Sequence, residues 1–347
     1  MPGTNRRSGT GLTIRTVAAH AGVSAMTVSN VMNNRGNVGE PTRRRVEAAI
    51  SELGYLPNMA ARGLASPGAS RMGVLYARPS SAFVSTILVN ALLATSARGV
   101  QLLAIDCEDA TEEGLIHRLR ELVRTGATSF LLLPPFAEAL SGTPIIAQLA
   151  CPFGAISTGR ALADMLTMRI DEYAATQSLT QLLLARGHRR IGFIAGPPSH
   201  SGSRARRDGF LAAMGEARVA VSADLLVEGD YNFASGLAAA SQLLALEERP
   251  TAIFAANDEM AAAAAWTAHR LGIAMPEQLA LAGFDDSPIA ARVFPSLTAV
   301  QQPIEEMTRR LTEALIDAMS SPSDGPRAQD TVVEFALIER ESTLKQR

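Results

Sequence analysis

The chain has 347 residues, of which 47% are hydrophobic and 19% are charged. This length suggests about two or three compact units, and this composition is typical of a globular protein rather than a disordered one. No apolar run approaches the roughly 20 residues of a membrane span, and the polar start of the chain lacks the apolar core of a signal peptide. We therefore expect a protein that is neither exported nor held in a membrane. Cys107 and Cys151 show no metal or redox spacing and are expected to be ordinary buried thiols.

Charge is distributed unevenly along the chain, whose formal net charge is -2. Residues 1–71 hold nine arginines and three acids, a net charge of +6, so the rest of the chain carries a net charge of −8. A basic head on an acidic body predicts a polyanionic partner for the head alone. A solubilising tail would give the same pattern, so charge by itself leaves both interpretations open.

Three short amphipathic helices are predicted in the basic head, over residues 14–20, 25–32 and 41–53. Thr13 and Ser24 can cap the first two helices, and apolar residues recur at helical spacing in all three. Gly22 permits a sharp turn between the first two helices. This helix-turn-helix geometry places the second helix in the DNA major groove. A three-helix bundle that contacts only protein is the alternative.

The early residues of the second helix would face the edges of the bases. Asn30 can bond an adenine edge in two places, and Ala25 and Met26 can touch thymine methyl groups. Ser24, Thr27 and the arginine run 43–45 suit phosphates. The DNA contacts predicted for the head are Thr13, Ser24, Ala25, Met26, Thr27, Ser29 and Asn30.

The head resembles that of the lactose-repressor/galactose-repressor family. The matching residues are TIRTVA (13–18), AGVS (21–24), TVS (27–29), Val46, Glu47, LGY (53–55) and PN (57–58). In that family a hinge helix follows, here residues 58–66, and Leu64 falls where a leucine wedges into the minor groove and kinks the DNA. The resemblance thus adds Asn58, Ala61 and Leu64 to the DNA contacts. Asn30 stands where many members have arginine, which favours adenine over guanine, and Gly63 weakens the hinge helix.

From residue 72 onward, apolar runs of strand length alternate with amphipathic helices of about 10–15 residues. Strands are predicted at residues 72–76, 101–105, 130–133, 153–156, 190–194, 225–228, 252–255 and 279–283. Strands joined through helices indicate βαβ units with parallel sheets. So many strands predict an α/β fold with two doubly wound lobes rather than a single sheet.

Polar and aromatic side chains follow four of the predicted strands, where ligands bind in open α/β sheets. They are Arg204, Arg206 and Arg207 in a loop, Asp230 and Tyr231, Asn257 and Asp258, and Asp285 and Asp286. Such groups can bond hydroxyls and stack on a sugar face, so a small polar ligand is predicted. Asp258 and Asp286 also precede helical stretches, so each is equally well explained as an N-cap.

The family resemblance extends over the body and covers residues 12–343 in all. It rests on GHRRI (187–191), residues 203–210, PTAIFAAND (250–258), GFDD (283–286) and PSLT (295–298). It implies a two-lobed domain similar to periplasmic sugar-binding proteins, with strands that cross between the lobes. The implied effector contacts are Phe83, Arg206, Tyr231, Asn257 and Asp285. Ser157 stands where some members have a ligand-binding aspartate, so an ordinary hexose is not assumed.

The sequence thus predicts a transcription repressor whose affinity for double-stranded operator DNA is changed by a sugar-like effector between the lobes. We expect a cytoplasmic, nucleoid-associated homodimer, because a pseudo-palindromic operator needs two heads. The predicted domains are residues 1–57 (helix-turn-helix), 58–70 (hinge helix and linker) and 71–347 (effector-binding domain). The first lobe comprises about 71–171 and 302–329, and the second about 172–301 and 330–347. The end of the chain shows no leucine heptads, so no tetramerising tail is expected.

Two other classes of protein are less consistent with the sequence. A solute-binding transport protein fits the body but not the basic head. An α/β enzyme is disfavoured because the sequence has no GxGxxG phosphate loop, no GxSxG elbow and no His/Cys/Asp metal set. We therefore expect no catalytic residues, no cofactor and no metal.

Overall fold

The computed structural model describes residues 14–32, 38–53, 70–77, 81–107, 111–320 and 328–344. The chain divides into two compact units, Met1–Ala69 and Ser70–Arg347. Thr13 and the predicted hinge, with Asn58, Ala61 and Leu64, lie outside the described residues.

The first unit contains the three predicted helices, α1 (Ile14–Ala21), α2 (Ala25–Met32) and α3 (Glu40–Leu53). Gly22 makes the turn between α1 and α2 with a φ of 65°, a conformation that glycine adopts without steric cost. Ser24 then caps α2, because its Oγ accepts a hydrogen bond from the Thr27 backbone N–H at 3.0 Å. The helices enclose a small core made of Val17, Ala18, Ala21, Val28, Val31, Val46 and Ala49.

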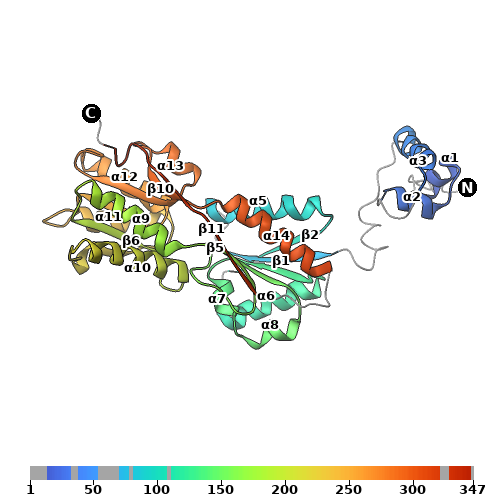
Figure 1. Cartoon of the computed structure of the whole chain (residues 1–347), viewed down its shortest axis with the longest axis horizontal. Coiled ribbons are helices and arrows are strands. Elements are labelled where there is room, and N and C mark those ends of the chain that lie inside the picture. Colours follow the sequence, from blue (N-terminus) through green and yellow to red (C-terminus); the bar gives the residue numbers. More distant parts are fainter. Residues whose placement is uncertain are drawn as a thin grey trace, which may run out of the picture. The chain divides into compact units, whose positions relative to one another are not determined.

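The second unit contains two six-stranded sheets, one in each lobe (Figure 1). The first sheet has the strand order β11-β5-β4-β3-β1-β2 and is parallel throughout. Its strands are β1 (Arg71–Tyr76), β2 (Gln101–Asp106), β3 (Ser129–Leu132), β4 (Phe153–Ile156), β5 (Leu166–Ile170) and β11 (Gln329–Val333). Helices α5 (Ala82–Ala97) and α14 (Ile304–Ser320) cover one face, and α6 (Glu112–Arg124), α7 (Phe136–Leu140) and α8 (Pro144–Leu149) cover the other.

The second sheet has the strand order β12-β10-β9-β8-β6-β7, and β12 alone is antiparallel to its neighbour. Its strands are β6 (Ile191–Ala195), β7 (Leu226–Glu228), β8 (Ala252–Ala255), β9 (Ala280–Asp285), β10 (Thr298–Gln301) and β12 (Ala336–Ile338). Helices α9 (Glu172–Ala185) and α10 (Ser201–Glu216) pack together, as do α11 (Phe233–Leu244) and α12 (Asp258–Arg270). A 3-10 turn, Ala223–Leu225, and α13 (Pro288–Arg292) complete this lobe.

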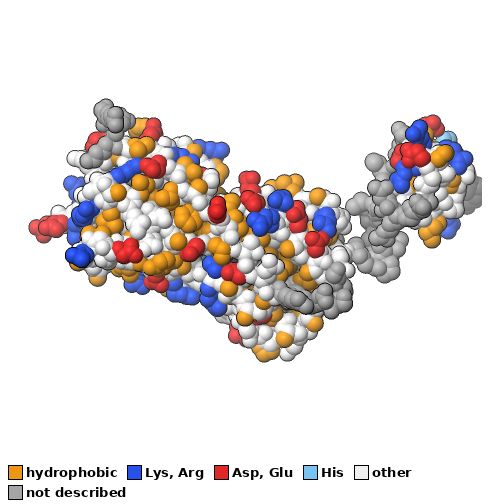
Figure 2. Space-filling model, in the orientation of Figure 1, with side chains coloured by type: hydrophobic (Ala, Val, Ile, Leu, Met, Phe, Trp, Pro, Cys, Tyr) orange, Lys and Arg blue, Asp and Glu red, His pale blue; other side chains and the backbone are white. Residues whose placement is uncertain are grey.

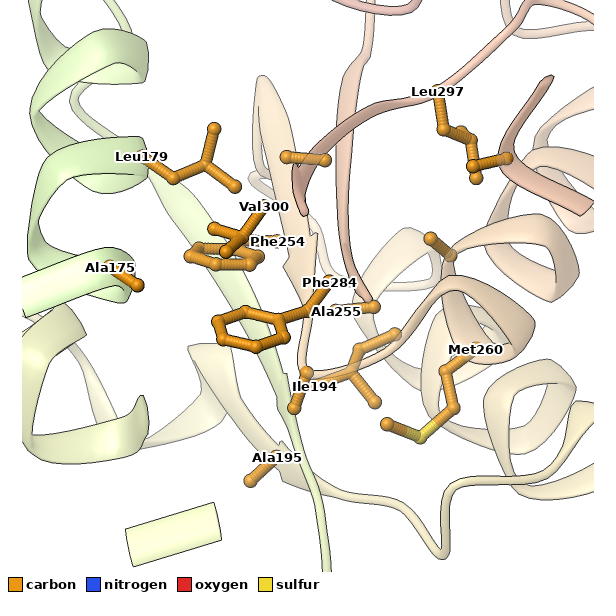
Figure 3. Packing of buried hydrophobic residues seen from close by; sticks show 14 of the residues in the cluster. Ala175, Leu179, Ile194, Ala195, Phe254, Ala255, Met260, Phe284, Leu297 and Val300 are labelled. Carbon is orange, nitrogen blue, oxygen red and sulfur yellow. The ribbon is translucent and has the colours of Figure 1, made fainter. Parts of the chain in front are cut away.

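The core of the second lobe lies on both faces of its sheet, which explains why its strands are continuous apolar runs. Figure 3 shows the rings of Phe254 and Phe284 against Leu179 of α9, with Met260 of α12 on the far side of the sheet. Phe193 stacks on Phe210 with ring centroids 4.8 Å apart, which fixes α10 to the same face.

The chain crosses between the lobes three times, after β5, after β10 and after β11. The α/β class, the two doubly wound lobes and the crossing segments are therefore confirmed. All eight predicted strands are present within two residues at each end, whereas β5, β10, β11 and β12 were not predicted.

In the part of the chain that the structure describes, none of the helices combines the length and the apolar character that a membrane span requires. The same residues contain no group of three or more His, Cys, Asp or Glu side chains that could hold a metal ion.

Candidate functional site

A cavity of about 310 Å³ is lined by residues of both lobes, most of them just beyond the carboxyl ends of strands. The second lobe contributes Asp230 and Tyr231 after β7, Asn257 after β8 and Asp285 at the end of β9. Its volume suits a small ligand. The cavity brings together all five side chains implied for the effector site: Phe83, Arg206, Tyr231, Asn257 and Asp285.

Arg206 is held at the floor of this cavity by protein groups on several sides. The prediction that it lies in a loop was wrong, because α10 begins at Ser201 and carries it on its second turn. Its Nε and Nη2 donate hydrogen bonds to the two carboxylate oxygens of Glu172 at 3.2 and 3.1 Å. Its Nη1 donates to the backbone oxygen of Ala256, and its guanidinium carbon lies 3.8 Å from the centroid of the Phe284 ring.

The electrostatic surroundings of Arg206 keep it charged. Burial acts to lower the pKa of its guanidinium, but the neighbouring acidic groups, Glu172 first among them, outweigh burial, so the net pKa lies above the ordinary value. Burial also raises the pKa of the Tyr231 phenol to about 12. Tyr231 is therefore a neutral hydrogen-bonding group at physiological pH, and its ring lies 5.8 Å from the Arg206 guanidinium carbon.

Asp285 connects the cavity to a segment that crosses between the lobes. Its Oδ1 accepts a hydrogen bond from Gln302 Nε2 at 2.7 Å and lies 3.9 Å from Arg206 Nη1. Gln302 follows β10, and its Oε1 lies 3.5 Å from the Oγ of Ser157. Burial raises the pKa of Asp285 to about 6, although Arg206 and the Gln302 hydrogen bond oppose that shift. Its φ of 103° lies in a region that residues other than glycine rarely adopt.

Asn257 has a structural role as well as a place in the cavity wall. Its Oδ1 accepts a hydrogen bond from Met260 N–H at 3.0 Å and so caps α12. Its Nδ2 donates to the backbone oxygen of Tyr231, also at 3.0 Å. Asn257 therefore positions Tyr231, whose φ is 55°, at the rim of the site.

Neither explanation offered for Asp258 and Asp286 holds. Asn257 and Ser287 occupy the N-cap positions of α12 and α13, and neither aspartate lines the cavity. Asp258 accepts hydrogen bonds from the N–H and Oγ of Ser287 at 2.6 and 2.9 Å. Asp286 accepts one from Gln301 Nε2 at 2.9 Å and lies 2.6 Å from Arg340 Nη1. Both hold the loop after β9 in place.

The first-lobe wall of the cavity is mostly apolar, with the hydroxyl side chains of Ser81 and Ser157 also in its lining. Phe83 and Val84 come from α5, and Pro134, Pro135 and Phe136 follow β3. The sequence predicted Asp230 at this site, but it did not predict Phe136 or two polar lining residues of the second lobe, Glu172 and His200. The only sequence signal for Glu172 was an acid at the start of a helix, which is ordinarily solvent-exposed.

The second candidate surface is the outward face of α2. Val28 and Val31 point into the core, and Met26 is 70% exposed. Helical spacing places Ser29 and Asn30 on the same side as Met26. Ala25 packs partly against the core, and the Ser24 and Thr27 hydroxyls lie 2.9 Å apart. An exposed methionine beside amide and hydroxyl groups suits the edges of bases.

A helix-turn-helix unit in one chain with a two-lobed domain around a polar cavity defines the class of ligand-responsive DNA-binding proteins. Residues 13–58 match the family described as bacterial regulatory proteins, lacI family, and residues 180–343 match the periplasmic binding protein-like domain. The chain belongs to the lacI family of bacterial regulatory proteins. It is a DNA-binding transcription regulator with an effector-binding domain.

Relatives match along nearly the whole chain. The transcriptional repressor PurR of Proteus mirabilis is 31% identical over 95% of this chain and 96% of its own. The transcriptional regulator GalS of Salmonella typhimurium is 31% identical over 90% of this chain and 92% of its own. The structure of the regulator CelR with cellobiose is 30% identical, covers 95% of this chain and 99% of that one, and superposes with a TM-score of 0.70. The lac repressor dimer bound to operator and the anti-inducer ONPF shares the fold, with a TM-score of 0.78 at 24% identity over 96% and 99% of the two chains.

Proposed function

We propose that this chain represses transcription at an operator read by α2, and that a small sugar-like effector in the cavity changes its affinity for that operator. The observation that carries the proposal is the convergence of Arg206 of α10 with polar side chains at three strand ends, Tyr231, Asn257 and Asp285, facing apolar side chains of the other lobe. A molecule bound by both lobes couples their arrangement to its own binding. The cellobiose complex of CelR supports a sugar-like ligand.

On the DNA side, Asn30 and Met26 of α2 are assigned to base edges, with Ala25 and Ser29 beside them. Ser24, whose hydroxyl also caps the helix, and Thr27, whose hydroxyl lies 2.9 Å from it, are assigned to phosphates. Thr13 and the hinge residues Asn58, Ala61 and Leu64 complete the proposed contacts on the strength of the family resemblance.

We propose that the protein acts as a homodimer through the outward face of α5. On this helix Val84, Ile87 and Ala91 are buried, whereas Val89, Leu92 and Leu93 are 54%, 52% and 62% exposed. Figure 2 shows hydrophobic side chains along the α5 side of this lobe. An exposed apolar stripe on one helix can pair with its own copy about a two-fold axis. Two heads would then face the two halves of a pseudo-palindromic operator.

The proposed role involves no catalysis. The groups in the cavity bind and orient a ligand, and Arg206 and Glu172 neutralise each other rather than forming a nucleophile-base pair. As a regulator of bacterial genes, the protein is assigned to the cytoplasm, at the nucleoid.

The proposal is tested by selecting DNA that binds the full chain from a random duplex library. We expect enriched sequences to form a pseudo-palindrome and to be lost when Asn30 and Met26 are both replaced by alanine. Enrichment without any two-fold pattern, or a pattern that the double variant keeps, would contradict the proposed operator reading.

A further inference from the structure

Glu172 is a buried carboxylate inside the cavity, and its placement is built into the fold. It is the first residue of α9, and its side chain is 1% exposed. Asp171 caps the helix by accepting a hydrogen bond from Ala174 N–H at 3.0 Å, which leaves Glu172 to face α10. Gly202 of α10 makes room for it, because a Cβ on Gly202 would lie 2.3 Å from Glu172 Oε2.

This carboxylate occupies most of the binding capacity of Arg206. A guanidinium has five N–H donors in a fixed fork, and a carboxylate that accepts two of them in parallel makes a strong, directional pair. Glu172 accepts from Nε and Nη2 of Arg206, and Ala256 accepts from Nη1. Arg206 therefore offers a ligand at most two N–H groups, and its positive charge is already balanced.

The remaining charge in the cavity is negative. Among the described lining residues, the carboxylates of Glu172, Asp230 and Asp285 are present with the single guanidinium of Arg206. Burial raises the pKa of Asp285 to about 6, so removing this carboxylate from water is unfavourable even with Arg206 nearby. His200 also lines the cavity, but the one guanidinium there is already paired with Glu172, so a bound anion would add a further buried negative charge beside three carboxylates.

The opposite wall offers no charge at all. Phe83, Val84 and Phe136 present aromatic and aliphatic surface, next to Pro134 and Pro135. A ligand that fills the cavity therefore meets mainly polar groups, rich in carboxylates, on one side and mainly apolar surface on the other.

We propose that the effector is an amphipathic molecule without anionic groups, whose hydroxyl or amine edge donates hydrogen bonds to Asp285 and whose apolar face packs on Phe83 and Phe136. Glu172 is the residue that excludes phosphorylated and carboxylated analogues, because its carboxylate pairs with the Arg206 guanidinium and neutralises its charge. An aryl glycoside has this chemistry, whereas a sugar phosphate does not. The inference rests on the proposed function in one respect, that the effector occupies this cavity.

The experiment measures binding of glucose 6-phosphate and inorganic phosphate to the full chain by calorimetry. The wild type is expected to bind neither. Glu172→Gln, which keeps the shape but removes the charge, should bind phosphate at least about tenfold more tightly than the lower limit set for the dissociation constant of the wild type, because the guanidinium is then free to pair with it. Glu216→Gln is the matched control, since Glu216 is exposed at the end of α10, the helix that carries Arg206, and also accepts hydrogen bonds across the contact between α9 and α10, from Gln177 and Gln181.

The double variant Glu172→Gln/Arg206→Gln should lose the gained phosphate binding, which shows that the gain arises in this cavity. The proposal would be overturned if the wild type bound glucose 6-phosphate saturably and Arg206→Gln abolished that binding. This comparison does not use Glu172→Gln, so it tests the proposal even if that variant folds poorly. A folded Glu172→Gln that gains no phosphate binding would also overturn it. Operator binding is recorded for every variant, so loss of DNA recognition would count against the proposed function and not against the charge selection.

Discussion

Ser201 of the second lobe donates a hydrogen bond from its Oγ to Glu138 Oε1 of the first lobe at 2.6 Å. The same Oγ accepts one from the Gly159 N–H, also in the first lobe, at 2.7 Å. These two bonds lie beside the cavity and join α10 to α7 and to the loop after β4. Ser201 therefore forms a contact between the lobes that can stabilise the arrangement in which both contact a ligand.

Loss of this contact should weaken effector binding. Ser201→Ala removes both bonds, and a loss of about 1 kcal/mol per bond predicts roughly tenfold weaker binding or more. Gly159→Ala should weaken binding further, because a Cβ there would lie 2.4 Å from the Ser201 backbone. Calorimetry with an effector found by screening measures both effects. Gly215→Ala is the control, since no atom lies within 4 Å of its Cβ position. Equal effector affinity in all three variants would show that the contact has no part in binding.

Asp285 should make effector binding depend on pH. Burial is the main reason that the pKa of this carboxyl is raised to about 6; Glu172, Glu259 and Asp258 add to the shift, and Arg206 opposes it. Above this pH Asp285 is ionised and accepts hydrogen bonds strongly, so effector affinity should fall as the pH drops below 6, approaching about tenfold per unit. Asp285→Asn should bind weakly at every pH between 5 and 8 while it keeps operator binding. A wild-type affinity that does not change over this range would contradict the assigned role.

The same pKa shift has a consequence for stability. Because folding raises the pKa of Asp285 from 3.8 to about 6, the folded protein holds a proton between these values that the unfolded chain releases. The contribution of this carboxyl to stability is therefore complete below about pH 4 and is lost as the pH rises through 6. Compared with the wild type, Asp285→Asn should gain stability as the pH rises from 4 to 7. Urea unfolding at the two pH values measures the difference, and the opposite trend would show that the pairing of Asp285 with Arg206 dominates.

Asn30 should determine one base pair of each operator half-site. Asn30→Ala should weaken the free energy of binding to the preferred sequence by about 1–3 kcal/mol, because a bidentate contact to adenine is lost. The variant should also show no preference for any base at that position. Fluorescence anisotropy on the selected operator and its single-base variants at one salt concentration measures this. An equal loss on all sequences would mean that Asn30 positions the helix without reading a base.

The exposed stripe of α5 should be required for dimerisation. Leu93→Arg is expected to shift the protein toward monomers, because it places a charge where two apolar stripes would meet. Sedimentation velocity over a range of concentrations measures the shift. Val123→Arg on α6 is the matched control, since Val123 is also partly exposed but lies on the other face of the lobe. A Leu93→Arg variant that remains dimeric would place the interface elsewhere.

The strands that could be predicted from the sequence have continuous apolar runs. Strands such as β5 and β11 could not be predicted, because the interactions that stabilise them come from residues on a partner strand. Strand β5 contains Thr167 and Arg169, and β11 begins with Gln329 and Asp330, so neither has an apolar run. Arg169 Nε and Nη2 donate to the two carboxylate oxygens of Asp330 at 3.0 and 2.8 Å across these strands. This pairing joins residues far apart in the chain, and local pattern cannot reveal it.

The residues of the candidate site also include some that could be predicted from the sequence and one that could not. Arg206, Tyr231, Asn257 and Asp285 could be predicted because they sit at strand ends or within family motifs. Glu172 could not, because its burial depends on Gly202 and Arg206, which join it only through the packing of α9 against α10. The cavity's excess of carboxylates is therefore a property of the folded chain alone.

A ligand in the cavity should control the affinity of the chain for operator DNA. The most direct test is fluorescence anisotropy of the selected operator with the full chain, with and without a library of uncharged metabolites and aryl glycosides, for the wild type and Asp285→Asn. We predict that at least one compound changes the wild-type operator affinity by about 5- to 150-fold, the usual range of allosteric coupling, and leaves the affinity of Asp285→Asn unchanged. A compound that shifts both proteins equally would place the effector site outside this cavity and contradict the account.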